Sequence, residues 1–122
     1  DVQLKAPTAV DAFAREVELL AEDGAYAVPA RVQVFRIGRY ALVGLPGMPF
    51  SEFALEIKDT SPAKETIVAG CTNGDLGVVI PRAAFEHGGF EAWTARSAKV
   101  GPGGGEFLAE ESTALLKGLW RK

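Results

Sequence analysis

Two corners of this 122-residue chain have the form of a reaction site. The first runs from Leu45 to Phe50, and the second runs from Asn73 to Glu91. Both follow apolar runs typical of strands and lead into helical patterns, and α/β proteins commonly place their chemistry at such corners. A carboxylate or a phenol would be useful at these corners, but the positions hold Met48, Val78 and Phe90. The sequence therefore predicts the frame of a site without its reactive atoms.

The chain has one histidine, His87, and one cysteine, Cys71. Zinc sites usually take three or four ligands, with two or more from His or Cys, so these two residues cannot make one. A single cysteine also excludes an internal disulfide. His87 precedes two glycines, and we expect it to end a helix, where the dipole favours it. Cys71 lies in an apolar run, and we expect a buried small side chain instead of a nucleophile.

Three further polar features are better explained by local structure than by chemistry. The glycine-rich stretch 101–105 lacks the Gly-Lys-Ser/Thr of a phosphate loop, and Glu106 would repel an anion there, so we expect a flexible loop. Ser51 is expected to be the N-cap of a helix, and Asp75 to lie in a turn. We expect five carboxylates on solvated helix faces, with no pair marked as general acid and base: Glu52, Glu56, Asp59, Glu110 and Glu111.

The composition is that of an ordinary globular chain, with 48% hydrophobic and 24% charged residues. A net charge of −3, with Lys and Arg spread along the chain, argues against nucleic acid or an anionic membrane as the main partner. No apolar run is long enough for a membrane helix, and no signal peptide is visible. Because the chain begins at Asp1 and not at Met, we expect a segment upstream. The compartment stays open.

Apolar periodicity predicts an amphipathic helix over 8–22, capped by Thr8 with Asp11 as partner and ended by Gly24. Its inward stripe would consist of Val10, Phe13, Ala14, Val17, Leu20 and Ala21. Alternation then predicts a hairpin of strands 32–37 and 40–45. The remaining expected elements are a helix over 51–58, strands over 66–72 and 77–80, a helical turn over 82–87, a loop over 92–105 and a helix over 106–120. In that last helix we expect five residues to face inward: Phe107, Leu108, Leu115, Leu116 and Leu119.

These elements predict an α/β fold with a mixed sheet and helices on at least one face. The run Tyr40–Leu45 is apolar throughout, which is typical of a strand covered on both faces. One chain of this size can hardly supply both covers. Residues 1–122 are therefore expected to form a single domain or the C-terminal portion of a larger, layered αββα-type domain.

Several short motifs, taken in order, resemble the later part of the neutral/alkaline, non-lysosomal ceramidase family and its bacterial relatives. The resemblance covers about residues 30–119 and is carried by Arg36-Ile37-Gly38, Ala41-Leu42-Val43-Gly44-Leu45-Pro46-Gly47, Thr72-Asn73-Gly74, Gly77, Pro81, Gly88-Gly89 and Glu91. Each piece is common, whereas their order and separation are more specific than any single piece.

The resemblance implies a zinc-dependent amidase that hydrolyses the N-acyl bond of ceramide, and hence a lipid-like ligand. In the family, zinc is held by histidines from earlier in the chain, by a Glu after Pro-Gly and by a Tyr after Gly. A further Tyr, after Gly-Gly, polarises the amide. These three positions map to Met48, Val78 and Phe90, each without the functional oxygen. Thioether, alkyl and phenyl groups are poor partners for zinc, so we expect no cofactor in this chain.

Three hypotheses follow for the function. In the first, the chain is a non-catalytic portion of a ceramidase-like protein that has lost its zinc site, with apolar replacements repacked as core and a structural or binding role. Its partner would be an upstream segment of the same protein or another copy of the chain. In the second, an upstream segment completes a zinc-dependent amidase. In the third, the chain is an autonomous module that binds a ligand or a protein.

Overall fold

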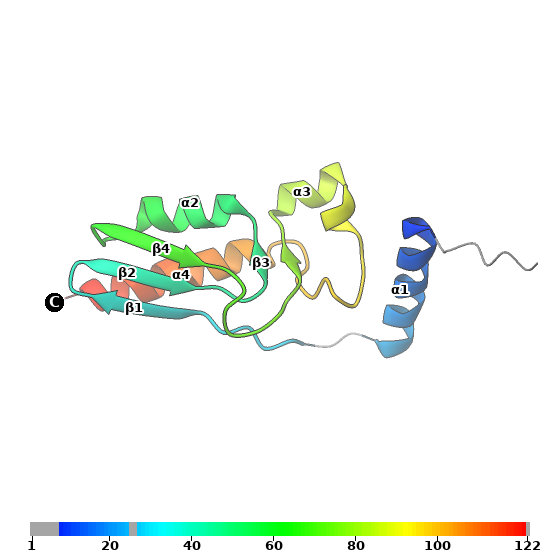
Figure 1. The fold of residues 1–122 in the computed structure, drawn as a ribbon, viewed down its shortest axis with the longest axis horizontal. Helices are drawn as coiled ribbons and strands as arrows, with labels where there is room; N and C mark the ends of the chain where they lie inside the picture. Colours follow the sequence, from blue (N-terminus) through cyan, green and yellow to red (C-terminus); the bar gives the residue numbers. More distant parts are fainter. Residues whose placement is uncertain (1–7, 25–26, 122) are drawn as a thin grey trace, which may run out of the picture.

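The structure, a computed structural model, describes residues 8–24 and 27–121. Its elements follow in the order α1 (Ala9–Asp23), β1 (Gln33–Ile37), β2 (Tyr40–Gly44), β3 (Met48–Pro49), α2 (Ser51–Thr60), β4 (Glu65–Ala69), β5 (Val78–Val79), α3 (Arg82–His87), the short 3-10 helix η1 (Phe90–Ala92) and α4 (Gly104–Trp120). Figure 1 shows the sheet with α2 and α4 at one end and α1 at the other.

The main sheet has three strands in the order β1-β2-β4. Strands β1 and β2 form an antiparallel hairpin around Gly38, whose φ of +62° suits a tight turn. Strand β4 pairs with β2 in parallel, because α2 carries the chain back across the sheet between them. A second, two-stranded sheet joins β3 and β5, also in parallel. The predicted hairpin, mixed sheet and α/β class are confirmed.

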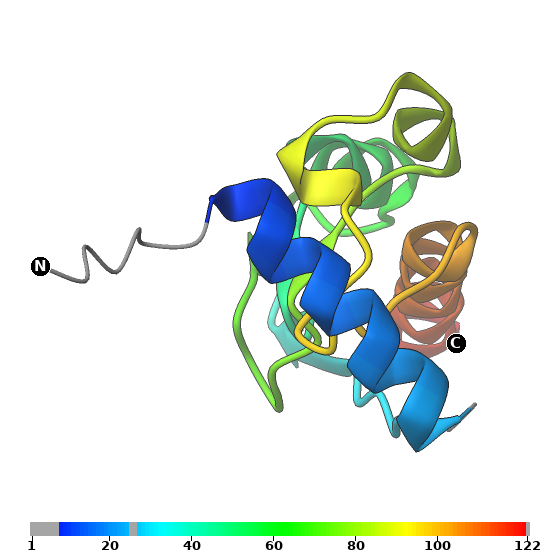
Figure 2. The ribbon, with the colours of Figure 1, turned by 90° about the vertical axis from the view of Figure 1, so that its right-hand side faces the viewer.

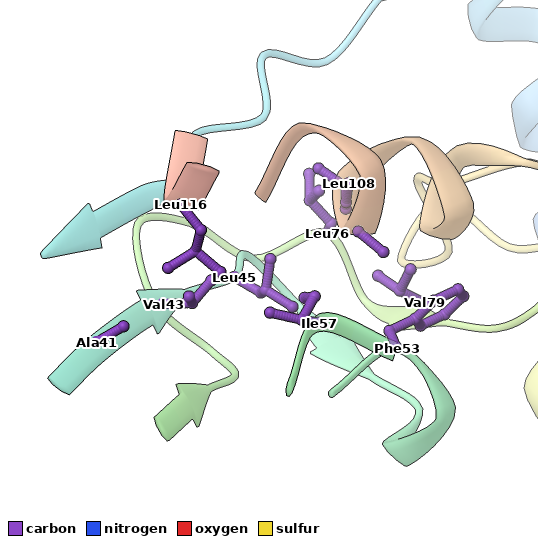
Figure 3. Close-up of a cluster of buried hydrophobic side chains, with 10 residues drawn as sticks. Ala41, Val43, Leu45, Phe53, Ile57, Leu76, Val79, Leu108 and Leu116 are labelled. Atoms are coloured by element: carbon purple, nitrogen blue, oxygen red, sulfur yellow. The ribbon is translucent and has the colours of Figure 1, made fainter. Parts of the chain in front are cut away.

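One face of the main sheet packs on α2 and α4 and forms the core. Ala41 and Val43 of β2 face Ile57 of α2 and Leu116 of α4, and all four side chains are buried (Figure 3). Leu45 and Val79 extend this cluster toward the second sheet. Burial of apolar surface is the main stabilising term in such a core, at about 25 cal/mol for each Å² removed from water.

The opposite face of the main sheet is not covered by the described residues. Here the paired positions Phe35, Leu42 and Ile67 form one row across all three strands, with Ile37 and Tyr40 beside it. We call these five residues the open face; all except Leu42 are exposed. The described residues cover one face only, because α2 and α4 both lie there, in line with the expectation that one chain of this size can hardly supply both covers.

Helix α1 has the predicted cap but not the predicted burial. The Thr8 hydroxyl accepts from the Asp11 N–H and the Asp11 carboxylate accepts from the Thr8 N–H, which completes a capping box. No residue of α1 is buried, so the inward-facing stripe was wrongly predicted. The helix lies across the end of the molecule instead of on the sheet (Figure 2). Phe13 reaches Phe90 and Trp93, with ring centroids 5.5 and 4.7 Å away.

Helix α4 begins at Gly104, inside the stretch predicted to be a loop. Gly105 is buried, and a Cβ there would strike the ring of Phe53, so the glycine lets α4 approach α2. Leu108 and Leu116 are buried as predicted, whereas Phe107, Leu115 and Leu119 are exposed, contrary to the prediction. The buried residues follow one stripe of three- and four-residue spacing. Phe107 lies outside it, whereas Leu115 and Leu119 follow Ser112 and Leu116 by three residues and lie at its border.

Acid should weaken the attachment of α1. The Arg96 side chain, and then its backbone N–H, donate to Glu16 and hold the pKa of that carboxyl below its ordinary value of 4.5. Because the pKa of Glu16 is lower in the folded protein, its bonds to Arg96 stabilise the fold at pH values above the ordinary pKa. This stabilisation is lost as the pH falls through the pKa of the folded protein. From about pH 5 to about pH 3 we therefore expect Trp93 emission to shift to longer wavelength as Phe13 leaves its ring.

The measurement uses a Trp120→Phe background, so that Trp93 alone emits. Asp11, whose pKa the Thr8 hydroxyl and N–H also lower, titrates in the same direction. The Glu16→Gln variant separates the two carboxyls, and we expect part of its red shift to be present already at pH 5. Identical pH profiles for Glu16→Gln and its parent would contradict the role given to Glu16.

Candidate functional site

The two corners singled out in the sequence meet in the second sheet. Met48 is paired with Val78 and Pro49 with Val79, in parallel register. The Met48 N–H donates to the Gly77 carbonyl at 2.8 Å, and the Phe50 N–H donates to the Val79 carbonyl at 3.0 Å. Two of the three substituted positions, 30 residues apart in the chain, therefore lie directly opposite each other.

Two glycines allow the corners to approach this closely. Gly47 and Gly77 have φ values of +69° and +71°, a region that disfavours other residues. A Cβ at Gly47 would lie 2.6 Å from the Gly77 carbonyl oxygen, and a Cβ at Gly77 would overlap the carbonyl oxygen of Ser97. Asp75 supports the same turn by accepting from the Gly77 N–H at 2.8 Å, as predicted from turn chemistry.

The substituted side chains are not repacked as core, which corrects that part of the first hypothesis. Met48 is 50% exposed and Phe90 is 64% exposed, while Val78 is half-buried. Strand β5 has only two residues, and because successive side chains of a strand point to opposite faces, Val79 enters the core and Val78 does not. The corner therefore keeps an accessible surface at the positions where the resemblance would place metal ligands.

Phe90, the third substituted position, lies in η1 and belongs to a different group of contacts. Its ring is 6.0 Å from that of Trp93, and both rings contact Phe13 of α1. Phe90 thus helps to attach α1 to the rest of the molecule. Sequence reasoning missed this aromatic cluster, and the only available signal was the apolar stripe of α1.

A pocket of about 320 Å³ lies beside the corner. Val78 of β5, Phe85 of α3, Trp93 and the carboxylate-bearing Glu91 contribute to its wall. Lys99 also borders it, and its ammonium group donates to the Asp75 carbonyl at 2.9 Å. The pocket is therefore mainly apolar with one acidic and one basic side chain at its rim, and it suits a small, largely apolar molecule.

The structure also tests the predictions for His87 and Cys71. His87 ends α3 and its ring Nδ1 lies 2.8 Å from the Ala83 carbonyl oxygen, which confirms the helix-terminal prediction. Cys71 is exposed with a φ of +55°, so the prediction of a buried strand residue is wrong. Strand β4 ends at Ala69, because the chain turns away there and the Cys71 N–H donates to the Gly47 carbonyl at 2.6 Å.

Ser51 is not an N-cap. Phe50 is the N-cap of α2, because its N–H donates to the Val79 carbonyl and keeps it outside the helix. Ser51 is then the first helical residue. Glu106 accepts from the Arg82 N–H at 2.7 Å and so satisfies the start of α3. The five carboxylates assigned to solvated faces are all exposed, as predicted.

Comparison with protein-family models, curated proteins and solved structures found no match to this chain. The side chains at the corner do not suit the zinc ion that the resemblance implies. Met48 offers a thioether, which is a poor zinc ligand, and Val78 offers no donor atom. Within residues 8–24 and 27–121, no three His, Cys, Asp or Glu side chains gather as a metal site. In the same residues, no helix is long and apolar enough to cross a bilayer.

Proposed function

We propose that this chain is a non-catalytic portion of a ceramidase-like protein, with a structural or binding role at a corner that has lost its zinc ligands. The observation that carries the proposal is the pairing of Met48 with Val78. The resemblance assigns both positions to one metal site from two separate motifs, and they lie opposite each other in the fold. Such proximity is what two ligands of one ion require.

The substitutions at these positions favour binding over catalysis. Metal-activated attack on an amide needs a bound cation and a donor for the developing oxyanion. Met48, Val78 and Phe90 supply neither group. The neighbouring pocket of about 320 Å³ keeps an apolar wall that includes Val78, so the corner can still hold an apolar group without reacting with it.

Zinc binding and amide hydrolysis test this proposal. We expect the purified chain to retain no stoichiometric zinc after dialysis, by elemental analysis, and to leave a fluorescent N-acylsphingosine intact. The double variant Met48→Glu/Val78→Tyr restores two oxygens at opposed positions and should bind zinc about tenfold more tightly, or better, by competition with a chromophoric chelator. Leu55→Glu, which adds a carboxylate on the exposed side of α2, is the matched control and should gain nothing.

Two results would defeat the proposal. Stoichiometric zinc with turnover in the unmodified chain would show an intact enzyme. Equal zinc affinity of the double variant and the Leu55→Glu control would show that Met48 and Val78 do not mark a vacated metal site. The second hypothesis, an amidase completed by an upstream segment, instead expects zinc and turnover only in a protein that contains such a segment.

A further inference from the structure

Strand β1 forms one edge of the main sheet. Among the described residues its one neighbour in the sheet is β2, and none of them pairs with its other side as a strand. Proteins commonly guard such edges with proline, a bulge or lysine, because a free edge recruits other strands. The five residues of β1 pair one-for-one with β2, without a bulge, and include no proline or lysine. Their one charged residue is Arg36, whose guanidinium donates to the Leu119 carbonyl of α4. The edge therefore has the form of a template for another strand.

A groove of about 490 Å³ runs between β1 and α4. None of the residues that line it carries a charge, and on α4 they include the exposed Leu115 and Leu119. These two leucines belong to the part of the apolar surface of α4 that does not pack into the core. An uncharged groove beside a free strand edge favours an apolar partner over an acidic or basic one.

Gly118 supplies a separate indication of close packing at this groove. A glycine inside a helix costs roughly 0.5–1 kcal/mol relative to alanine. Nothing in the described part of one copy lies within 4 Å of where its Cβ would be, so internal packing does not require it. Together with Ala114, one turn earlier, it makes a small-residue surface that would let a second helix approach closely.

We propose that β1 pairs antiparallel with β1 of a second copy of this chain, around a two-fold axis at Phe35. The register follows from the hairpin. Ile37 and Tyr40 flank its two-residue turn and form a hydrogen-bonded pair. In an antiparallel pair the backbone groups of successive residues point to opposite sides of the strand, so those of Gln33, Phe35 and Ile37 bond to β2. Val34 and Arg36 then present their backbone groups outward. Centring the axis on Phe35 places Val34 opposite Arg36 of the second copy, and both can bond.

The charges permit this register. No like charges oppose each other, since each Arg36 faces a valine. The Arg36 guanidinium is also held away from the strand edge, because it donates to the Leu119 carbonyl at 2.7 Å and lies 4.6 Å from the Trp120 ring centroid. The two Phe35 side chains would meet on the same side as the open face, forming a continuous six-stranded sheet.

The helices permit it as well. A two-fold axis perpendicular to the sheet keeps both α4 helices on one side, where Leu115 and Leu119 of each copy fill the groove of the other. Helix α1 of the same chain does not occupy that place, because it lies at the other end of the molecule (Figure 1). There its Phe13 packs on Trp93. A second copy would bond to the free edge of β1, fill the groove and pack against Gly118 at the same time. For this reason we infer a second copy as the occupant.

Sedimentation equilibrium of the full chain and four variants tests the pairing. We expect the unmodified chain to be a dimer at tens of micromolar. Phe35→Lys and Leu115→Glu should raise the dimer Kd about 30-fold or more, the effect expected of a central interface residue. Ile67→Lys and Leu55→Glu are matched controls, at the far edge of the sheet and on α2, and should leave the Kd unchanged. The leucines are 46% and 58% exposed, so neither change disrupts a core.

Either of two results would overturn the pairing. A folded monomer at all concentrations would exclude the dimer, and an Ile67→Lys effect equal to that of Phe35→Lys would place the contact on the open face instead of the β1 edge. Should a charged variant lose its circular dichroism, Phe35→Cys in a Cys71→Ser background replaces it. Opposed Phe35→Cys sulfurs should cross-link on oxidation, whereas Ile67→Cys should not, and the reverse pattern would refute the register.

Discussion

The Gly77→Ala variant should lose about 3 kcal/mol or more of its free energy of unfolding, because a left-handed backbone and a steric overlap add together. The new Cβ would overlap the carbonyl oxygen of Ser97, which is backbone and cannot rotate away. Since the Gly77 carbonyl also accepts from the Met48 N–H, movement of this turn should separate β3 from β5. Urea unfolding monitored by circular dichroism measures the loss.

Gly88→Ala is the matched control for that experiment. Gly88 has a φ of +72°, nearly that of Gly77, but nothing lies within 4 Å of its missing Cβ. Its ψ of −160° places it in a region almost confined to glycine. The variant should therefore show the backbone cost alone, about 1–3 kcal/mol. A difference of less than about 0.5 kcal/mol between the two variants would mean that the Ser97 turn yields easily. The two corners would then not depend on the close approach of these segments.

Ile57→Ala should cost about 2–5 kcal/mol, the range for removing a large aliphatic side chain from a core. Ile57 is fully buried between the sheet and α4, in contact with the cluster that includes Val43 and Leu116. The lost side chain leaves a cavity that the rigid sheet cannot collapse to fill. Thermal unfolding at one fixed protein concentration measures the change, since dimerisation would make the midpoint depend on concentration.

Leu55→Ala, two residues earlier on the same helix, is the control for Ile57→Ala. Leu55 is exposed, so its replacement should change stability by no more than about 0.5 kcal/mol. Similar costs for the two variants would contradict the assigned core. The unfolding curve of the unmodified chain also tests the hypothesis of an autonomous module. A single cooperative transition favours such a module, whereas a broad transition favours part of a larger domain.

Much of the fold could be predicted because its signals are local. Alternating residues and a Gly38 turn predicted the hairpin, and Thr8 with Asp11 predicted the start of α1. These features depend on residues close in sequence, where side-chain period and backbone preference suffice. The errors at Ser51 and Cys71 have another origin. Hydrogen bonds to Val79 and Gly47, more than 20 residues away, shifted the start of one helix and ended one strand early.

The candidate site was only partly predictable for the same reason. The resemblance grouped Met48, Val78 and Phe90, and the fold places the first two opposite each other but puts the third with Phe13 and Trp93. Residue identity showed that none of the three carries an oxygen for zinc. Identity does not say which side chains become exposed, and the half-exposed Met48 shows that an apolar residue at such a corner need not enter the core.

By itself, the sequence determined most of the element types and the α/β class, because these depend on residue identity and local period. Only the tertiary structure decided which apolar surfaces are used. Helix α4 has more apolar surface than one core can bury, and the sheet has two apolar faces, so local patterns allow several packings. The helices α2 and α4 lie on one face, which leaves the open face and the outer side of β1 uncovered by the described residues and Leu115 partly exposed.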